Sequence, residues 1–92
     1  MAKVFHIDNT LIAQCYSPAF QPKIENYRLV AEVDSEDLEH IFRLTNHIEN
    51  DWWENEGIKV IEKSRSTSVG DMVELSNGKR FICKFVGWEE FQ

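Results

Sequence analysis

The stretch Tyr27-Arg-Leu-Val-Ala-Glu-Val-Asp-Ser-Glu-Asp-Leu-Glu-His-Ile-Phe-Arg-Leu-Thr45 carries the clearest structural signal, because its hydrophobic period changes part-way along. Residues 27, 29, 31 and 33 are apolar and alternate onto one face, which predicts a strand. Asp34 or Ser35 then offers an N-cap, and acidic residues follow where the helix dipole favours negative charge. Apolar residues continue at helical spacing as far as Ile48, so we expect a helix over about Ser35–Glu49.

The segments on either side of this stretch predict short strands. We expect strands at Lys3–Ile7 and Ile58–Glu62, and Thr10–Tyr16 is apolar enough to form another. Prolines 18 and 22 mark a loop, because proline lacks a backbone donor and disfavours helix before it. Ser76-Asn77-Gly78-Lys79 predicts a type I′ turn between strands at Asp71–Leu75 and Arg80–Trp88.

These elements predict an α+β fold: a small antiparallel or mixed β-sheet with one main helix packed on it and a C-terminal β-hairpin. A length of 92 residues leaves room for one hydrophobic core, so we expect a single domain over residues 1–92. An apolar fraction of 42% argues against intrinsic disorder.

The cysteine count predicts a cytoplasmic protein with reduced thiols. Two cysteines, Cys15 and Cys83, are fewer than a small secreted domain usually carries, and a disulfide between them is the alternative. Residues 1–8 lack the apolar run of a signal peptide, and no apolar stretch approaches the roughly 18 residues of a membrane span. We therefore expect no membrane partner.

Charge is distributed unevenly along the chain, within a net charge of −6. Between Glu32 and Glu56 nine carboxylates accompany one base, Arg43, whereas from Gly57 to Lys84 six bases accompany three acids. Such a dipolar molecule can orient its encounter with a charged partner. A well-solvated surface without a partner is the simpler interpretation.

Candidate sites for metal or covalent chemistry are weak. His40 and His47 share a helix face but would stand about 10 Å apart along its axis, too far to bind one ion together. Cys15 and Cys83 lie in apolar runs, where a thiol usually packs as a small hydrophobe. We therefore expect no cofactor, no metal and no catalytic residue.

The segment Ser64-Arg-Ser-Thr-Ser-Val-Gly-Asp71 is rich in hydroxyls and could in principle cradle a phosphate. It lacks the order of a P-loop and leads into a predicted strand instead of a helix N-terminus. The favoured interpretation is that its hydroxyls cap backbone groups of a tight loop.

The expected helix Leu38–Ile48 is followed, after a short loop, by Ser66-Thr-Ser-Val-Gly-Asp-Met-Val-Glu-Leu75, Asn77-Gly-Lys79 and Arg80-Phe-Ile-Cys-Lys-Phe-Val-Gly-Trp-Glu-Glu90. In this order of segments, residues 27–91 resemble the YodL-like (KfrB/YodL) small domain. That family pairs a hydroxyl-rich S-x-S-V-x-D-V-V strand with a second strand ending F-G-F-x-E, and here Trp88 departs from the pattern. The resemblance implies a compact α+β fold and a plasmid- or phage-borne accessory protein, without established catalytic residues.

Two adjacent tryptophans carry the sharpest binding hypothesis, because adjacent side chains cannot easily enter one core and exposed Trp is enriched at interface hot spots. We expect a non-catalytic accessory protein that binds and modulates a host or defence protein with a basic surface through the acidic helix and the Trp loop. Imitation of nucleic acid by the carboxylates is one mode in which it could bind. The expected contact residues are Glu36, Glu39, Arg43, Asp51, Trp52, Trp53 and Glu54.

Two other classes of function compete with this one. The alternative is a nucleic-acid-binding module that uses the basic C-terminal hairpin, with contacts from Lys63, Arg65, Lys79, Arg80 and Lys84. The overall acidity counts against it, since repulsion would weaken the encounter with nucleic acid. A small hydrolase or transferase is the third class. The exposed strand edges also suggest a homodimer.

Overall fold

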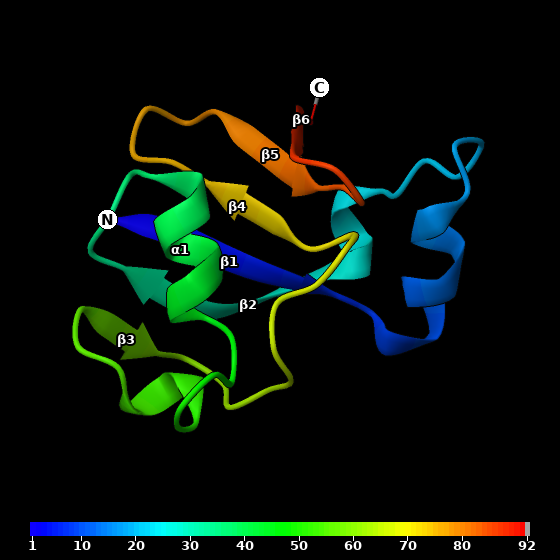
Figure 1. The fold of residues 1–92 in the computed structure, drawn as a ribbon. Coiled ribbons are helices and arrows are strands. Elements are labelled where there is room, and N and C mark those ends of the chain that lie inside the picture. The colour runs from blue at the N-terminus through cyan, green and yellow to red at the C-terminus, as the bar shows by residue number, and fades with distance from the viewer. Residues whose placement is uncertain (92) are drawn as a thin grey trace.

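The computed structural model describes residues 1–91 and contains one antiparallel sheet with the strand order β3-β2-β1-β4-β5-β6 (Figure 1). The strands are β1 (Ala2–Ile7), β2 (Tyr27–Val33), β3 (Ile58–Val60), β4 (Met72–Glu74), β5 (Arg80–Cys83) and β6 (Trp88–Glu90). The helices are α1 (Leu38–Leu44) and three 3-10 helices, η1 (Asn9–Tyr16), η2 (Ile24–Asn26) and η3 (Trp52–Glu54). The α+β class and the helix packed on a sheet are confirmed.

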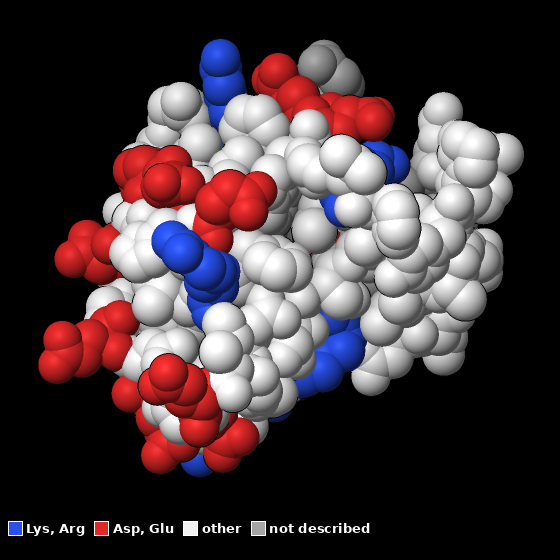
Figure 2. Space-filling model, in the orientation of Figure 1, with Lys and Arg blue, Asp and Glu red and all other residues white. Residues whose placement is uncertain are grey.

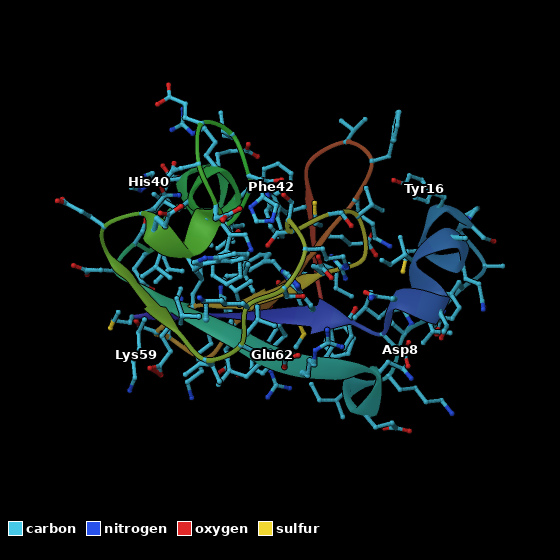
Figure 3. All side chains as sticks on the ribbon, turned by 90° about the horizontal axis from the view of Figure 1, so that it is seen from below. Asp8, Tyr16, His40, Phe42, Lys59 and Glu62 are labelled. Carbon is cyan, nitrogen blue, oxygen red and sulfur yellow. The ribbon has the colours of Figure 1, made fainter. Side chains whose placement is uncertain are left out.

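The hydrophobic core lies between the sheet and α1, which covers one face of it (Figure 3). The central strand β1 contributes Val4, which pairs in register with Ala31 of β2 and Val73 of β4. All three side chains are fully buried, as are Ile41 of α1 and Trp52 of η3. Removing a Val or Ile side chain from water contributes roughly 1.5–3 kcal/mol, and Ala31 contributes less, so this layer is the main source of stability.

The opposite face of the sheet carries a row of alternating charges. Strand register brings together five side chains in spatial order, namely Lys59, Glu32, Lys3, Glu74 and Arg80. The outer pairs approach most closely, with Lys59 Nζ 3.7 Å from Glu32 and Arg80 Nε 2.9 Å from Glu74. Opposite charges on adjacent strands stabilise pairing modestly and help to fix the register.

The predicted helix is shorter than expected at both ends. The Asp37 carboxylate, and neither Asp34 nor Ser35, caps its start by accepting from the amides of Glu39 and His40 at 3.0 and 3.3 Å. The helix ends at Leu44, where side-chain amides bond to the last backbone carbonyls. Asn55 donates to the Leu44 carbonyl and Asn46 donates to the Phe42 carbonyl. The chain then leaves the helix.

Three other local predictions are corrected. Residues 10–16 form the 3-10 helix η1 instead of a strand, because the Asp8 side chain accepts from Thr10 at 2.9 Å and starts a turn. Gly78 alone has positive φ, 87°, in the β4–β5 connection, so the predicted type I′ turn is absent from it. The expected strand Arg80–Trp88 ends at Cys83, and residues 84–87 turn the chain so that β6 returns beside β5. Gly87, with a φ of 73°, supplies the left-handed conformation in this turn.

Candidate functional site

The hydroxyl-rich loop is organised by a buried ion pair between Arg65 and Asp71. The carboxylate lies fully buried and accepts both arms of the guanidinium at 2.6 and 2.8 Å. It also accepts from the amides of Ile7 at 2.8 Å and Ser68 at 2.7 Å. Arg65 uses its three other N–H groups on Asn9, Ser66 and Ile7. Its five donors are therefore occupied, which removes Arg65 from the predicted nucleic-acid contacts.

His6 completes this buried cluster. Its Nε2 lies 2.9 Å from the Thr67 hydroxyl and its Nδ1 3.1 Å from the Ser64 hydroxyl. Burial lowers the pKa of His6 to about 4, although the nearby Asp71 carboxylate opposes that shift. The ring is therefore neutral at pH 7 and holds the loop against β1. The predicted capping of the loop's own backbone is wrong for these two hydroxyls, because both bond to the His6 side chain, whereas the Ser66 hydroxyl accepts from the backbone amide of His47.

The two cysteines are both free thiols in the structure. Burial raises the pKa of Cys83 to about 11, and it raises the pKa of Cys15 as well. A thiol with a raised pKa carries little thiolate at pH 7, which is the form that reacts. Both side chains therefore favour a packing function over a nucleophilic one.

The Trp pair divides between core and surface. Trp52 is fully buried and its indole N–H donates to the carbonyls of Ser64 at 2.9 Å and Arg65 at 3.1 Å. It cannot touch a partner in this fold, which corrects its place among the contact residues. Trp53 is half-buried, edge-on to the His47 ring at 5.2 Å, with Lys63 Nζ 5.5 Å from its ring centroid.

Residues 46–56, here called the acidic loop, lie between α1 and β3 and include η3. Ile48 is 68% exposed, although its spacing predicted a place in the helix core. Four exposed carboxylates belong to the same loop, namely Glu49, Asp51, Glu54 and Glu56. Within residues 1–91 no Lys or Arg side chain pairs with any of these four acids, and His47 Nδ1, 3.6 Å from Asp51, is the only basic group that approaches one of them.

The acidic loop is held in place even though its tip is exposed. The His47 amide donates to the Ser66 hydroxyl at 2.8 Å, and the Trp52 amide donates to His47 Nδ1 at 3.2 Å. The Thr67 amide donates to the Thr45 carbonyl at 2.9 Å. The buried cluster thus attaches the loop that carries Ile48 to the rest of the fold through hydrogen bonds within the chain.

The three predicted contact residues on and beside α1 have different surroundings. Glu36 accepts two hydrogen bonds from Ser76 at 2.8 Å, which lower its pKa, and Glu39 accepts from the Trp88 indole at 3.1 Å. These two carboxylates tie the helix to the sheet, whereas Arg43 is exposed. Figure 2 shows acidic atoms gathered over α1 and the segment beside β3.

The predicted basic hairpin does not form one surface. Arg80 pairs with Glu74 in the charge row, and Lys63 lies against Trp53. Lys79 and Lys84 flank opposite ends of β5, which separates them by about five residues of extended chain, or roughly 16 Å. This scatter disfavours the nucleic-acid-binding alternative.

Within residues 1–91, no group of three His, Cys, Asp or Glu side chains could hold a metal ion, and no helix there is long and apolar enough to cross a membrane. No protein-family model matches the chain, and comparisons with curated proteins and with solved structures find no match. The resemblance to the YodL-like domain therefore stays a prediction.

Proposed function

We propose that this protein is a non-catalytic interaction protein that binds a basic partner protein through the acidic loop. The observation that carries the proposal is the exposure of Ile48 among four exposed carboxylates on a loop fixed from beneath. In protein interfaces, burial of an apolar side chain supplies affinity, and the charges around it steer and orient the partner as it approaches.

The energetics of the loop support this assignment. Full burial of an Ile side chain is worth roughly 1.5–3 kcal/mol, and Ile48, which is 68% exposed, leaves most of that gain to a binding partner. The carboxylates lower the local potential and attract a basic surface before contact. Since His47 and Trp52 already hold the loop, its ordering costs little entropy at the moment of binding.

The resemblance of residues 27–91 to the YodL-like domain supports a phage- or plasmid-borne setting for this protein. We propose a cytoplasmic phage- or plasmid-type accessory protein that modulates a host or defence protein. Carboxylates on α1 and the acidic loop would occupy a basic groove in place of phosphates, so the protein would act by nucleic-acid mimicry. Absence of catalysis fits the neutral, fully bonded His6 and the raised thiol pKa values.

Affinity capture from a lysate of cells that carry the gene tests the proposal. The bait is the wild-type protein beside the double variant Ile48→Ser/Glu49→Gln, which alters only exposed side chains. Replacement of Trp52 is unsuitable because it would remove a core residue. We expect a protein with a basic surface that the wild type retains and the variant loses.

The chain offers a matched control in Ile24→Ser/Glu25→Gln. Ile24 is also exposed, at 46%, and Glu25 follows it on η2, so the two variants make the same chemical change at different places. The control should capture the same partner as the wild type. Equal capture by all three baits, or recovery of nucleic acid alone, would refute the assignment of the acidic loop. Release of the partner by about 0.5 M salt would support mimicry through charge.

A further inference from the structure

A groove of about 700 Å³ separates the N-terminal arm, residues 9–22, from the hairpin of β5 and β6. The arm contributes an uncharged wall, because residues 9–22 contain no Asp, Glu, Lys or Arg. The hairpin contributes the other wall, in which Ile82 and Phe91 lie beside Lys84 and two carboxylates. Figure 3 shows Tyr16 on the arm across from the loop that joins β5 to β6.

The rim of this groove is apolar. Phe85 and Val86, at the tip of the hairpin, are 82% and 84% exposed, and Tyr16 is 57% exposed. The rings of Tyr16 and Phe85 meet edge to face with centroids 6.5 Å apart, so the two walls touch at one end. Turns usually carry polar residues, and two large apolar side chains at a tight turn indicate a contact surface.

The outer edge of β6 borders the groove. Among the described residues no strand pairs with this edge, since β6 is last in the sheet order. The Gly87 carbonyl accepts from the Lys84 amide at 3.0 Å, and the Phe91 amide donates to the Arg80 carbonyl at 2.8 Å. The backbone groups of Gly87 and Phe91 therefore face β5. By the alternation of antiparallel ladders, the backbone groups of Trp88 and Glu90 point away from β5. They are available to an added strand.

The side chains along the β6 edge determine which sequence pattern an added strand should have. Residues 88–91 read Trp-Glu-Glu-Phe, and Glu89 and Glu90 are both exposed. Cross-strand neighbours interact most strongly when they are opposite in charge or both apolar. A complementary strand therefore reads apolar-basic-basic-apolar, a pattern that is the same in either strand direction.

We propose that the β6 edge and the adjoining groove bind an extended segment of a partner protein with the pattern apolar-basic-basic-apolar. The segment adds a seventh strand, and apolar residues flanking it contact Phe85, Val86 and Tyr16. This surface is separate from the acidic loop, so a partner engages each independently. A second copy of the chain does not fit, because antiparallel pairing of two β6 edges would oppose carboxylates to carboxylates.

Two capped hexapeptides test the proposal against the full chain. The probe is acetyl-Thr-Val-Lys-Lys-Val-Thr-amide, and its matched control is acetyl-Thr-Val-Glu-Glu-Val-Thr-amide. Titration to millimolar concentration is followed by NMR of the backbone amides. We expect the lysine peptide to bind about tenfold more tightly, through two cross-strand charge pairs, with slowed hydrogen exchange at the amides of Trp88 and Glu90.

The double variant Glu89→Lys/Glu90→Lys should reverse this preference and bind the glutamate peptide more tightly. A peptide of the same composition with alternating order, acetyl-Thr-Lys-Val-Lys-Val-Thr-amide, should bind the wild type more weakly than the probe. Three results would overturn the proposal: equal binding of both lysine peptides, amide changes outside β6 and the groove, or self-association of the free protein through β6. Each can occur whether or not the acidic loop captures its partner.

Discussion

At the scale of single residues, the buried pair of Arg65 and Asp71 is expected to matter most for stability. Replacing Arg65 by Ala leaves a buried carboxylate without its partner, which costs about 3–5 kcal/mol in the free energy of unfolding. The half-exposed pair of Arg80 and Glu74 is the matched comparison, and Arg80→Ala should cost below about 1 kcal/mol. Urea unfolding of both variants measures the difference. Equal losses would show that the loop is anchored by other contacts.

His6 gives the protein a pH dependence above the range in which carboxylates titrate. Its pKa is about 4 in the folded state against 6.5 unfolded, so between these values the unfolded chain binds the extra proton. Stability contributed by the neutral ring is therefore complete above pH 6.5 and is lost as pH falls toward 4. From pH 7 to pH 5 we expect a loss of about 2 kcal/mol.

The variant His6→Gln separates this effect from other titrations. It removes the titrating ring, so its free energy of unfolding should change little between pH 7 and pH 5, whatever its absolute value. His40→Gln, at an exposed position on α1, should keep the wild-type loss. A wild-type slope that survives in His6→Gln would assign the pH dependence to another group.

At the scale of elements, the attachment of η1 to the sheet depends on a close approach at Gly70. A Cβ there would lie 2.4 Å from the Cys15 sulfur of η1, and φ is 98°. Gly78 has a similar φ of 87° but open space around it. Gly78→Ala should therefore cost about 1 kcal/mol from backbone strain alone, and Gly70→Ala clearly more.

Thermal unfolding of the two variants tests this contact. We also expect Gly70→Ala to perturb the NMR signals of η1, residues 9–16, and Gly78→Ala to leave them unchanged. If the two substitutions cost the same, η1 is not packed against Gly70 as described.

The elements also show where sequence reasoning succeeded and failed. The strand at residues 27–33 and the helix after it could be predicted from local signals. The predicted alternation of residues 27, 29, 31 and 33 onto one face is wrong, because a register shift at Val30 buries it together with Ala31. The end of α1 could not, since it depends on Asn55, which is eleven residues beyond Leu44. The apolar run at residues 10–16 predicted a strand but forms the 3-10 helix η1. A short apolar run does not reveal whether another strand lies beside it to pair with, so it fits a strand and a helix equally well.

At the scale of the whole molecule, the unequal charge along the sequence becomes an unequal charge in space. Exposed acids gather over α1 and the acidic loop, whereas the arm is uncharged (Figure 2). The sequence predicted the acidic region but not the exposure of Ile48, on which the proposed contact rests. Ile48 fits a buried helical stripe, and only the early end of α1 exposes it. The sequence alone could not decide which tryptophan is buried, because the acceptors of the Trp52 indole, the carbonyls of Ser64 and Arg65, are distant in sequence.

The central claim is that a partner binds through Ile48 and the carboxylates around it. The most direct measurement is the dissociation constant of the captured partner, determined by calorimetry for the wild type, Ile48→Ser/Glu49→Gln and Ile24→Ser/Glu25→Gln. Loss of one buried aliphatic contact and one charge should weaken binding by the first variant at least about tenfold. The second should match the wild type within about twofold. Equal constants for all three proteins would contradict the account and place the interface elsewhere.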